Sequence, residues 1–397
     1  MQSDESIRNL LIYSKYDKLN QYILSDISFE IVESDKELFL FRNYRSNNKQ
    51  QYNSFMSVTD LFDINGVGIT TAHDDFVIST DKSELIERFE SFRNMPQRTD
   101  LYKMFNVKEK QGWDIRAGWC NLQNDTPTES YIKSISYRPF DTRYIFYEDK
   151  LVWRTVRKVM MNFVMGENIG LVTARSNKSD TCDHFFITAN MMETKCGERT
   201  TQSAVFPLYK YDSEYGKRMV NIKETVAIKL LKSIGIRYTD DMALQLFDYI
   251  YAVLYSPKYR EKYKEFLKID FPRVPYPTDK ETFWKLVEIG SKLRECHLMH
   301  TEFDTEPYSF IGEGTNEVVK PEYKNGRVYI SKTQYFDNVP QAQWEQYIGG
   351  YQPLQKWLKD RKKMTLSPED IEHYKKIIAA LKLTEELMAQ IDEIVEF

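Results

Sequence analysis

The period of the hydrophobic residues changes along the chain, and this change constrains the fold more than any other feature of the sequence. Between residues 131 and 211, apolar and polar residues alternate in short runs rich in β-branched and aromatic side chains, which is typical of strands. From 224 to 299, and again from 367 to 395, apolar residues recur at spacings of three and four, which is typical of helices. The sequence therefore predicts an α+β protein in which a mixed-sheet module is flanked by helical segments.

The β-rich segment is expected to contain five strands and one internal helix. The helix is predicted at residues 152–164, where Val156, Met160 and Phe163 recur at helical spacing. Strands interrupted by a helix indicate an α/β module rather than an all-β one. The predicted strands are residues 132–137, 144–147, 169–174, 185–189 and 204–209.

Three segments in the second half of the chain are predicted helices. Residues 243–255 have a broad apolar face, and residues 278–281 form a Thr-Asp-Lys-Glu capping box that opens a second helix. Ser367 and Pro368 begin the last helix as its cap and first residue, and its apolar residues form a near-heptad stripe over 371–395. A long amphipathic helix of this kind requires a partner helix.

The boundaries between parts of the chain are not marked by a low-complexity linker, so they are placed where the hydrophobic period changes. Alternating runs at 27–32 and 38–41 predict two strands, and the polar residues 42–51 predict a loop because they cannot pack into a core. Residues 81–92 have the apolar spacing of a helix, and a strand is predicted at 327–331. We expect four parts: an N-terminal connector (1–130), an α/β recognition module (131–220), a helical segment with a looped β insertion (221–350) and a C-terminal helical segment (351–397).

The composition excludes a disordered chain and a membrane-spanning one. Apolar residues make up 42% of the 397 residues, and no run approaches the ~20 consecutive apolar residues that a membrane helix needs. Residues 1–9 are polar and lack the apolar core of a signal peptide. Four cysteines are too few and too scattered for a disulfide framework or a paired-cysteine metal site. We therefore expect a soluble, cytoplasmic protein with reduced thiols.

Motifs for nucleotide binding and methyl transfer are absent from the sequence. Gly66-Val-Gly68 lacks the third glycine of a phosphate-binding loop, and Gly349-Gly350 stands alone. The Asn-Pro-Pro-Tyr or Asp-Pro-Pro-Tyr tetrapeptide, with which amino-methyltransferases hold an exocyclic amine, does not occur. We therefore expect no catalytic residue, no metal site and no cofactor in this chain.

Two short patterns allow other interpretations. His297 and His300 have the spacing of a metal-binding pair, but no Cys or acidic partner lies nearby, so we interpret them as solvated helix-end residues. Glu322 and Lys324, with Asp304 upstream, form half of a nuclease motif, which arises easily by chance in a chain that is 29% charged. A metal-dependent nuclease remains an alternative.

Basic residues gather in one window although the chain as a whole carries a net charge of −4. Residues 131–178 contain nine basic and four acidic side chains, a net charge of +5. Arginines at strand ends and at a helix start suit phosphate contacts, and two polar loops, 175–180 and 195–202, carry the donors and acceptors that recognise base edges. For each arginine, a surface ion pair is the alternative. The candidate DNA-binding residues are Arg138, Arg143, Arg154, Arg157, Lys158, Arg175, Ser176, Asn177, Lys178, Lys195, Arg199 and Thr200.

The stretch Ser136-Tyr-Arg-Pro-Phe-Asp-Thr-Arg-Tyr-Ile-Phe-Tyr147 resembles the C-terminal specificity region of single-chain restriction-modification enzymes of the type ISP and type IIG kinds. The resemblance extends in order along nearly the whole chain. It covers residues 68–76, 151–158, 166–175, 205–209, 247–260, 269–276, 348–352, 357–361 and 366–374.

The resemblance implies a function. In that family an adenine-N6 methyltransferase domain precedes a target recognition domain, so the resemblance implies sequence-specific binding of double-stranded DNA. It also implies an adenine methyltransferase domain or subunit as partner, with S-adenosylmethionine bound there and not here. The upstream motifs of the family are missing, so we expect either a C-terminal fragment or a separately encoded specificity protein. A protein-interaction module that pairs through its terminal helix is a further alternative.

Overall fold

The computed structural model describes residues 46–397, with the exception of residues 125, 180 and 213. The chain separates into two compact units, Met1–Asn53 and Ser54–Phe397. Among the described residues, none of the helices combines the length and the apolarity that crossing a membrane requires.

One prediction for the N-terminal part is wrong. Helix α2 (Ser46–Ser54) occupies much of the segment 42–51 that was predicted to be a loop. Its residues are polar, but Lys and Gln favour helices, and neither Gly nor Pro interrupts the stretch. The two strands predicted at 27–32 and 38–41 lie outside the described residues.

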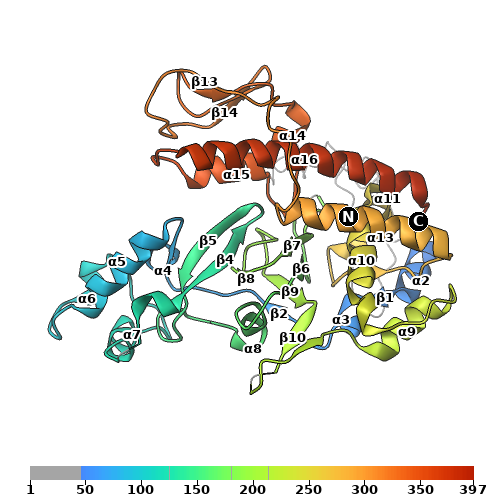
Figure 1. Ribbon diagram of the computed structural model, residues 1–397, viewed down its shortest axis with the longest axis horizontal. Coiled ribbons are helices and arrows are strands. Elements are labelled where there is room, and N and C mark those ends of the chain that lie inside the picture. Colours follow the sequence, from blue (N-terminus) through green and yellow to red (C-terminus); the bar gives the residue numbers. More distant parts are fainter. Residues whose placement is uncertain (1–45, 125, 180, 213) are drawn as a thin grey trace, which may run out of the picture. The chain divides into compact units, whose positions relative to one another are not determined.

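Two four-stranded sheets lie within Ser54–Phe397 (Figure 1). The first has the order β3-β5-β4-β8; β8 runs parallel to β4 and the other pairs are antiparallel. The second, of order β2-β9-β6-β7, is antiparallel throughout. The mixed-sheet α+β prediction is therefore confirmed. The strands are β2 (Gly66–Val67), β3 (Ile78–Ser79), β4 (Ile132–Arg138), β5 (Asp141–Phe146), β6 (Gly170–Ala174), β7 (Phe186–Thr188), β8 (Met191–Met192) and β9 (Ser203–Pro207).

The five predicted strands are all present, with their ends displaced by a few residues. The segment 204–209 divides into β9 and the start of β10 (Tyr209–Tyr211), which pairs with β11 (Arg218–Val220). The short strands β2 and β3 complete the two sheets, so both sheets include residues from either side of position 130.

The helix predicted over 152–164 is wrong for its first half. Only α8 (Arg157–Met160) and a following 3-10 turn (Met161–Phe163) are helical. Val156 adopts a left-handed conformation with φ of 47°, which a continuing helix does not allow. Before it, residues 151–153 form a turn and bends, and Arg154 pairs through its backbone with Thr70.

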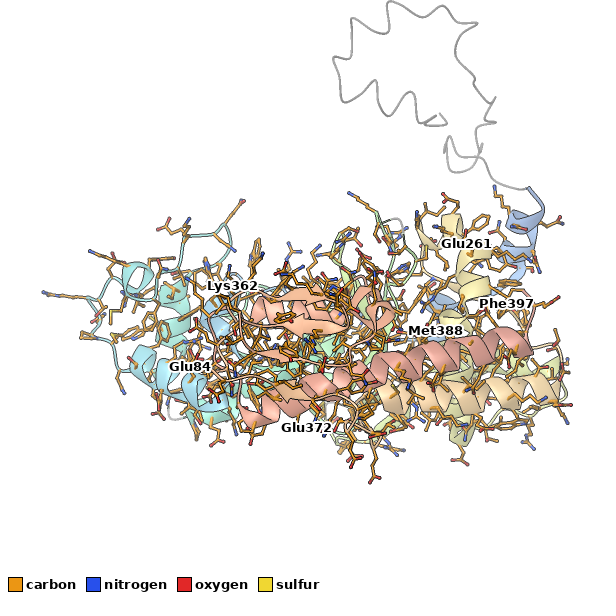
Figure 2. The ribbon with its side chains drawn as sticks, turned by 90° about the horizontal axis from the view of Figure 1, so that it is seen from above. Glu84, Glu261, Lys362, Glu372, Met388 and Phe397 are labelled. Atoms are coloured by element: carbon orange, nitrogen blue, oxygen red, sulfur yellow. The ribbon has the colours of Figure 1, made fainter. Side chains whose placement is uncertain are left out.

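Three helices pack together, as their apolar faces predict. Helices α10 (Ala243–Tyr255) and α13 (Lys280–His297) contact each other, and α16 (Pro368–Ile394) lies beside α13 in both views of the molecule (Figures 1 and 2). The predicted N-cap of α16 is present and forms a capping box: the Ser367 hydroxyl accepts from the Asp370 amide at 3.1 Å, and the Asp370 carboxylate accepts from the Ser367 amide at 3.1 Å. The partner helix that α16 requires is thus part of the same chain.

Gly290 allows the backbones of α10 and α13 to lie close together. A Cβ atom at Gly290 would lie 1.9 Å from the carbonyl oxygen of Asp248, so only glycine permits this approach of the two backbones. The Asp248 carboxylate also accepts from the Arg294 guanidinium at 2.7 Å, and both groups are buried. The N-cap of α13 is Asp279, one residue later than the predicted Thr278.

The helices also cover the second sheet. Every residue of β6 and β9 is buried. The Phe206 ring of β9 packs against Phe62 and Phe271 at centroid distances of 5.6 and 5.4 Å, and Phe62 reaches Phe247 of α10 at 6.5 Å. The sheet is therefore fixed to the helices by an aromatic core.

The predicted β insertion forms a third four-stranded sheet of order β13-β16-β15-β14, which contacts α16 where the rings of Phe336 and Tyr374 lie 4.4 Å apart. Its strands are β13 (Phe310–Ile311), β14 (Glu322–Lys324), β15 (Arg327–Tyr329) and β16 (Tyr335–Phe336). The remaining elements of this unit are α3 (Val58–Leu61), α4 (Asp74–Val77), α5 (Lys82–Arg93), α6 (Leu101–Met104), α7 (Ile115–Asn121), α9 (Glu224–Lys232), α11 (Pro257–Lys262), α12 (Lys264–Leu267), α14 (Gln341–Glu345), α15 (Pro353–Asp360), the 3-10 turns Thr128–Tyr131 and Asp240–Met242, and the pair β1 (Met56–Ser57) and β12 (Arg273–Val274).

Candidate nucleic-acid interface

The two polar loops predicted to contact bases lie side by side. Loop A (residues 175–178) follows β6 and loop B (residues 195–202) precedes β9, and these strands are neighbours in the sheet. The main-chain amide of Lys178 donates to the Thr200 hydroxyl at 3.1 Å, and the Thr201 hydroxyl donates to the carbonyl oxygen of Ser176. The fold thus joins two loops that are distant in the sequence into one surface.

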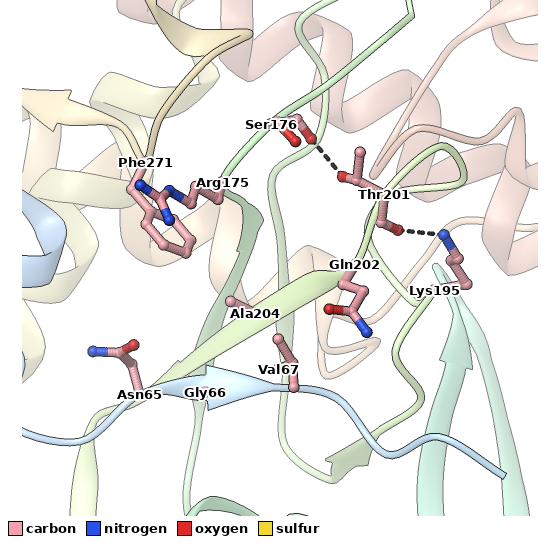
Figure 3. A pocket seen from close by; sticks show the side chains of 10 residues that line it. All are labelled: Asn65, Gly66, Val67, Arg175, Ser176, Lys195, Thr201, Gln202, Ala204 and Phe271. Carbon is pink, nitrogen blue, oxygen red and sulfur yellow. Dashed lines mark hydrogen bonds between the residues drawn. The ribbon is translucent and has the colours of Figure 1, made fainter. Parts of the chain in front are cut away.

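A pocket of about 520 Å³ opens between these loops and the paired strands β2 and β9 (Figure 3). Three of the predicted site residues, Arg175, Ser176 and Lys195, contribute to its lining. On one side, the Lys195 ammonium donates to the carbonyl oxygen of Thr201 at 2.7 Å. The lining consists of Asn65, Gly66, Val67, Arg175, Ser176, Lys195, Thr201, Gln202, Ala204 and Phe271.

Arg175 is the most accessible cation of the pocket. Its side chain is 76% exposed and forms one long ion pair, 3.4 Å, with the equally exposed Asp270. Surface pairs of this kind contribute little to stability. The guanidinium can therefore exchange Asp270 for a ligand at small cost.

Asn177 occupies a different place from the one predicted. Its side chain is buried, and its amide nitrogen donates to the carbonyl oxygen of Thr181 at 3.0 Å and to Nδ1 of His184 at 2.9 Å. Its amide oxygen accepts from the main-chain nitrogen of Ser179 at 2.6 Å. Burial, and then the nearby Arg260, lowers the pKa of His184 to about 3, so the imidazole is neutral and can accept. Asn177 therefore organises loop A, and its amide is occupied by partners within the protein.

Loop B is organised by a buried acid. The Glu198 carboxylate is fully buried and accepts from both the amide and the hydroxyl of Thr200, each at 2.6 Å. Thr200 is thereby occupied inside the protein, whereas Arg199 and, in loop A, Lys178 are exposed. The exposed cations of the two loops, Arg175, Lys178 and Arg199, are thus available to a ligand.

The segment with Gly349 and Gly350 packs against the backbone of loop B. The Gly349 amide donates to the carbonyl oxygen of Asp183 at 2.8 Å, and the Tyr351 hydroxyl donates to the carbonyl oxygen of Lys195 at 2.8 Å. Gly350 has a φ of 72°, and a Cβ atom there would lie 3.3 Å from the amide nitrogen of Arg199. The pair therefore serves to pack backbone on backbone.

Arg138 is not available for phosphate contacts. Its guanidinium forms an ion pair with Glu193 and lies 3.9 Å from the centre of the Tyr137 ring, and both charged side chains are nearly buried. The Glu193 carboxylate also accepts from the Lys195 amide at 2.7 Å, at the first residue of loop B. Arg138 thus anchors the start of loop B through Glu193.

Arg143 is also an internal residue. It donates to the buried Asp141 at 2.7 Å and lies 3.4 Å from Asp360 at the end of α15, while Arg361 donates to the other oxygen of Asp141 at 3.0 Å. Burial acts to raise the pKa of Asp141, but Arg361 and Arg143 hold that pKa below its usual value. Arg143 therefore ties β5 to α15.

The remaining three predicted cations face the solvent. Arg154, Arg157 and Lys158 are exposed at and just before α8. Arg157 pairs with Asp149 at 2.6 Å, and both side chains are close to half exposed. Within the described part of the chain, Arg154 and Lys158 have no acidic partner. These side chains can approach a phosphate backbone without breaking a buried contact.

The family model of the type ISP C-terminal specificity domain matches residues 60–390, which is most of the chain. The chain belongs to this family. The specificity domain described here has no match among curated proteins.

Solved structures share its fold. One is DrdV in a DNA complex, with a TM-score of 0.71, 19% identity and 98% of this chain covered. Another is a nuclease-deletion mutant of the type ISP restriction-modification enzyme LlaGI in complex with a DNA substrate mimic, with a TM-score of 0.68, 17% identity and 94% of this chain covered. The ATP-dependent type ISP enzyme LlaBIII bound to DNA has a TM-score of 0.68, 16% identity and 92% covered. This chain spans 41%, 37% and 26% of those chains, respectively.

The nuclease-like pattern and the histidine pair found in the sequence of the specificity domain do not lie in a cluster of metal-binding side chains within the described residues. Glu322 and Lys324 lie on β14, with side chains 42% and 61% exposed, and pair with each other at 3.2 Å. Of the described residues, no three His, Cys, Asp or Glu side chains gather as a metal site would require. His300 is exposed, but the interpretation of His297 as solvated is wrong, since it is buried between Tyr251 and Thr384.

Sequence reasoning missed six side chains that line the pocket, among them Thr201 and Ala204. Gln202 ends loop B but was not singled out, and Asn65, Val67 and Phe271 lie outside the basic window. A signal for Gln202 exists in its place as the last residue of the predicted polar loop 195–202. Nothing near Asn65 or Phe271 in the sequence connects them with the loops, because tertiary structure alone brings them together.

Proposed function

We propose that this chain recognises a specific sequence in double-stranded DNA, as the specificity part of a restriction-modification enzyme. The observation that carries the proposal is that loops A and B lie together beside a pocket with polar and apolar lining residues, in a member of the type ISP specificity family. Arg175 and Arg199 present guanidinium groups of the kind that pair bidentately with guanine. The DNA-bound state of the similar structures supports the same choice.

The proposal assigns a separate role to the cations near α8. Arg154, Arg157 and Lys158 are exposed and bear no buried structural pair, which suits contacts to phosphates. Such contacts fix the position of the protein on the duplex and supply affinity that falls with salt. The pocket side chains then supply the preference for one sequence.

The proposed partner is an adenine-N6 methyltransferase domain or subunit that binds S-adenosylmethionine. Support comes from the family resemblance and from the sequence, in which neither the glycine loop nor the Pro-Pro-Tyr tetrapeptide occurs. Calorimetry with this chain should therefore detect no binding of S-adenosylmethionine, and micromolar binding would contradict the assignment.

The main test is selection of duplexes from a random pool by the 397-residue chain, followed by titration of the enriched and scrambled duplexes at two salt concentrations. We expect one motif to be enriched and to bind more tightly than its scrambled form. Equal affinity for all duplexes would contradict the proposal. The same assay with Mg²⁺ tests the nuclease alternative, because cleavage that is lost in the Glu322→Gln variant would favour it.

A further inference from the structure

We propose that Gln202 and Val67 recognise one A·T base pair of the target, with the Gln202 amide on the adenine edge and the Val67 methyls on the thymine methyl group. This inference rests on the proposed function and names part of its specificity. It also assigns to Gln202 the contact that the sequence suggested for Asn177.

The first argument is the state of the Gln202 side chain. It is exposed, it lines the pocket, and its amide makes no hydrogen bond within the described residues. Its neighbours are fixed on both sides. The Thr201 carbonyl oxygen accepts from the Lys195 ammonium, and the Ser203 amide donates to the carbonyl oxygen of Thr194 at 2.7 Å. A free amide on a fixed backbone is arranged to bind a ligand without reordering the loop.

The second argument is the strand register. Val67 of β2 pairs directly with Ala204 of β9, so their side chains share one face of the sheet. Gln202 directly precedes β9, two residues before Ala204, and its side chain lines the same pocket. Because Ala204 is small, it leaves space between the two larger side chains, and Figure 3 shows all three around the pocket.

The third argument is chemical fit. In the major groove, adenine offers one acceptor and one donor, which the amide of Gln complements, and thymine offers a methyl group to an apolar side chain. Val67 is 36% exposed and so presents methyl groups to solvent. Arg175, across the pocket, provides the different chemistry that guanine needs. An amide and an aliphatic side chain in one pocket match the two halves of a single A·T pair.

Replacement of the amide tests the adenine contact. Gln202→Glu keeps the shape but only accepts hydrogen bonds, which suits cytosine N4, so the preferred base at one position should change from A to C. Gln202→Ala should relax the preference at the same position by roughly 5- to 100-fold. Asn65→Ala, which removes another amide of the same pocket, and Gln390→Ala, which removes an exposed glutamine of α16, are the controls and should keep the wild-type motif.

Replacement of thymine by deoxyuridine tests the methyl contact. In the enriched duplex, loss of the thymine methyl group at that pair should weaken binding by wild type about fourfold. The Val67→Ala variant should show no such difference between thymine and deoxyuridine. Circular dichroism should show all variants folded, since both positions are on the surface.

The outcomes separate the two proposals. A change confined to one base position supports the inference. An unchanged motif in both Gln202 variants overturns it while leaving the proposed function intact, as does a change of motif in Asn65→Ala alone. Failure of wild type to enrich any motif overturns the proposed function and the inference with it.

Discussion

The main-chain amide of Lys178 donates a hydrogen bond to the hydroxyl of Thr200, 22 residues further along the chain. Thr200 also binds the buried Glu198 carboxylate through its own amide and hydroxyl. One side chain therefore fixes both the distance between loops A and B and the internal shape of loop B.

Removal of that hydroxyl should loosen both loops. We expect Thr200→Val to lower the free energy of unfolding by about 1 to 2 kcal/mol, because it leaves one oxygen of the buried Glu198 with a single partner. Affinity for the selected duplex should fall more than affinity for a scrambled one. Thr200→Ser keeps the hydroxyl and should behave nearly as wild type in urea denaturation and in titration. A similar loss in Thr200→Ser would show that the hydroxyl is not responsible.

The glycine pair behind loop B gives a second prediction. Gly350→Ala places a side chain at a φ of 72° and against the backbone of Arg199, so it should cost about 1 to 2 kcal/mol of stability and also reduce sequence preference. Gly326→Ala has a similar φ of 79° but no atom within 4 Å of the new Cβ. This control should lose about 1 kcal/mol in thermal or urea unfolding and keep the wild-type DNA preference. If both variants bind DNA alike, the glycine pair does not position loop B.

Neighbouring residues of loop A should respond in opposite ways to truncation. Arg175→Ala removes an exposed side chain and should change stability by less than about 0.5 kcal/mol, while it costs about 1 to 3 kcal/mol of binding on the selected duplex and little on a scrambled one. Asn177→Ala removes several buried hydrogen bonds and should cost about 2 kcal/mol of stability. Equal binding losses for Arg175→Ala on both duplexes would remove this arginine from the specificity contacts.

The salt dependence of binding should distinguish surface cations from internal ones. Lys158→Ala should weaken binding to all duplexes and reduce the slope of log K against log salt by about one. Arg138→Ala should instead cost about 3 kcal/mol of stability, since it leaves Glu193 buried without its partner. Titration across salt concentrations measures the first effect and urea denaturation the second. An unchanged slope in Lys158→Ala would place this side chain away from the phosphates.

The buried histidines should make stability depend on pH. Burial, and then Arg260, lowers the pKa of His297 to about 3, whereas an unfolded chain binds the proton with a pKa near ~6.5. Between these values the unfolded state holds more protons, so the stability present above pH ~6.5 is lost as the pH falls. The loss should be about 2 kcal/mol at pH ~5 for His297, with a similar loss for His184.

Removal of the titrating group identifies the source of this loss. His297→Gln should be less stable than wild type at neutral pH, but its stability should fall less steeply between pH ~6.5 and ~5. Leu381→Ala, a buried truncation in α16, should lose stability and keep the full pH dependence. Parallel urea titrations at the two pH values provide the comparison. Equal slopes in all three proteins would refute the role of His297.

Hydrophobic period predicted the secondary structure well where packing agrees with local preference. Residues 243–255 form a helix with the predicted ends, and the cap at Ser367 is the observed one. The period was misleading at 152–164, where Val156 takes a left-handed conformation because the chain pairs with Thr70. A contact with a residue so distant in the sequence leaves no mark on local spacing.

The candidate site was predictable as a region and not residue by residue. The sequence indicated both loops, but it could not distinguish exposed Arg175 from buried Asn177, because each is a polar residue in a polar stretch. Arg138 and Arg143 illustrate the same limit. Their acidic partners Glu193 and Asp141 are revealed only by the pairing of β4 with β5 and β8.

The residues that shape the two loops are different from those that face outward. The buried side chains of Asn177 and Glu198 form hydrogen bonds within the two loops, and Gly350 packs against the backbone of loop B. Arg175 and Gln202, in contrast, are exposed at the pocket. Substitutions at the outward positions therefore leave folding almost untouched. Under the proposed function, a member of this lineage can therefore acquire a new target sequence through a few codon changes, without inventing a new fold.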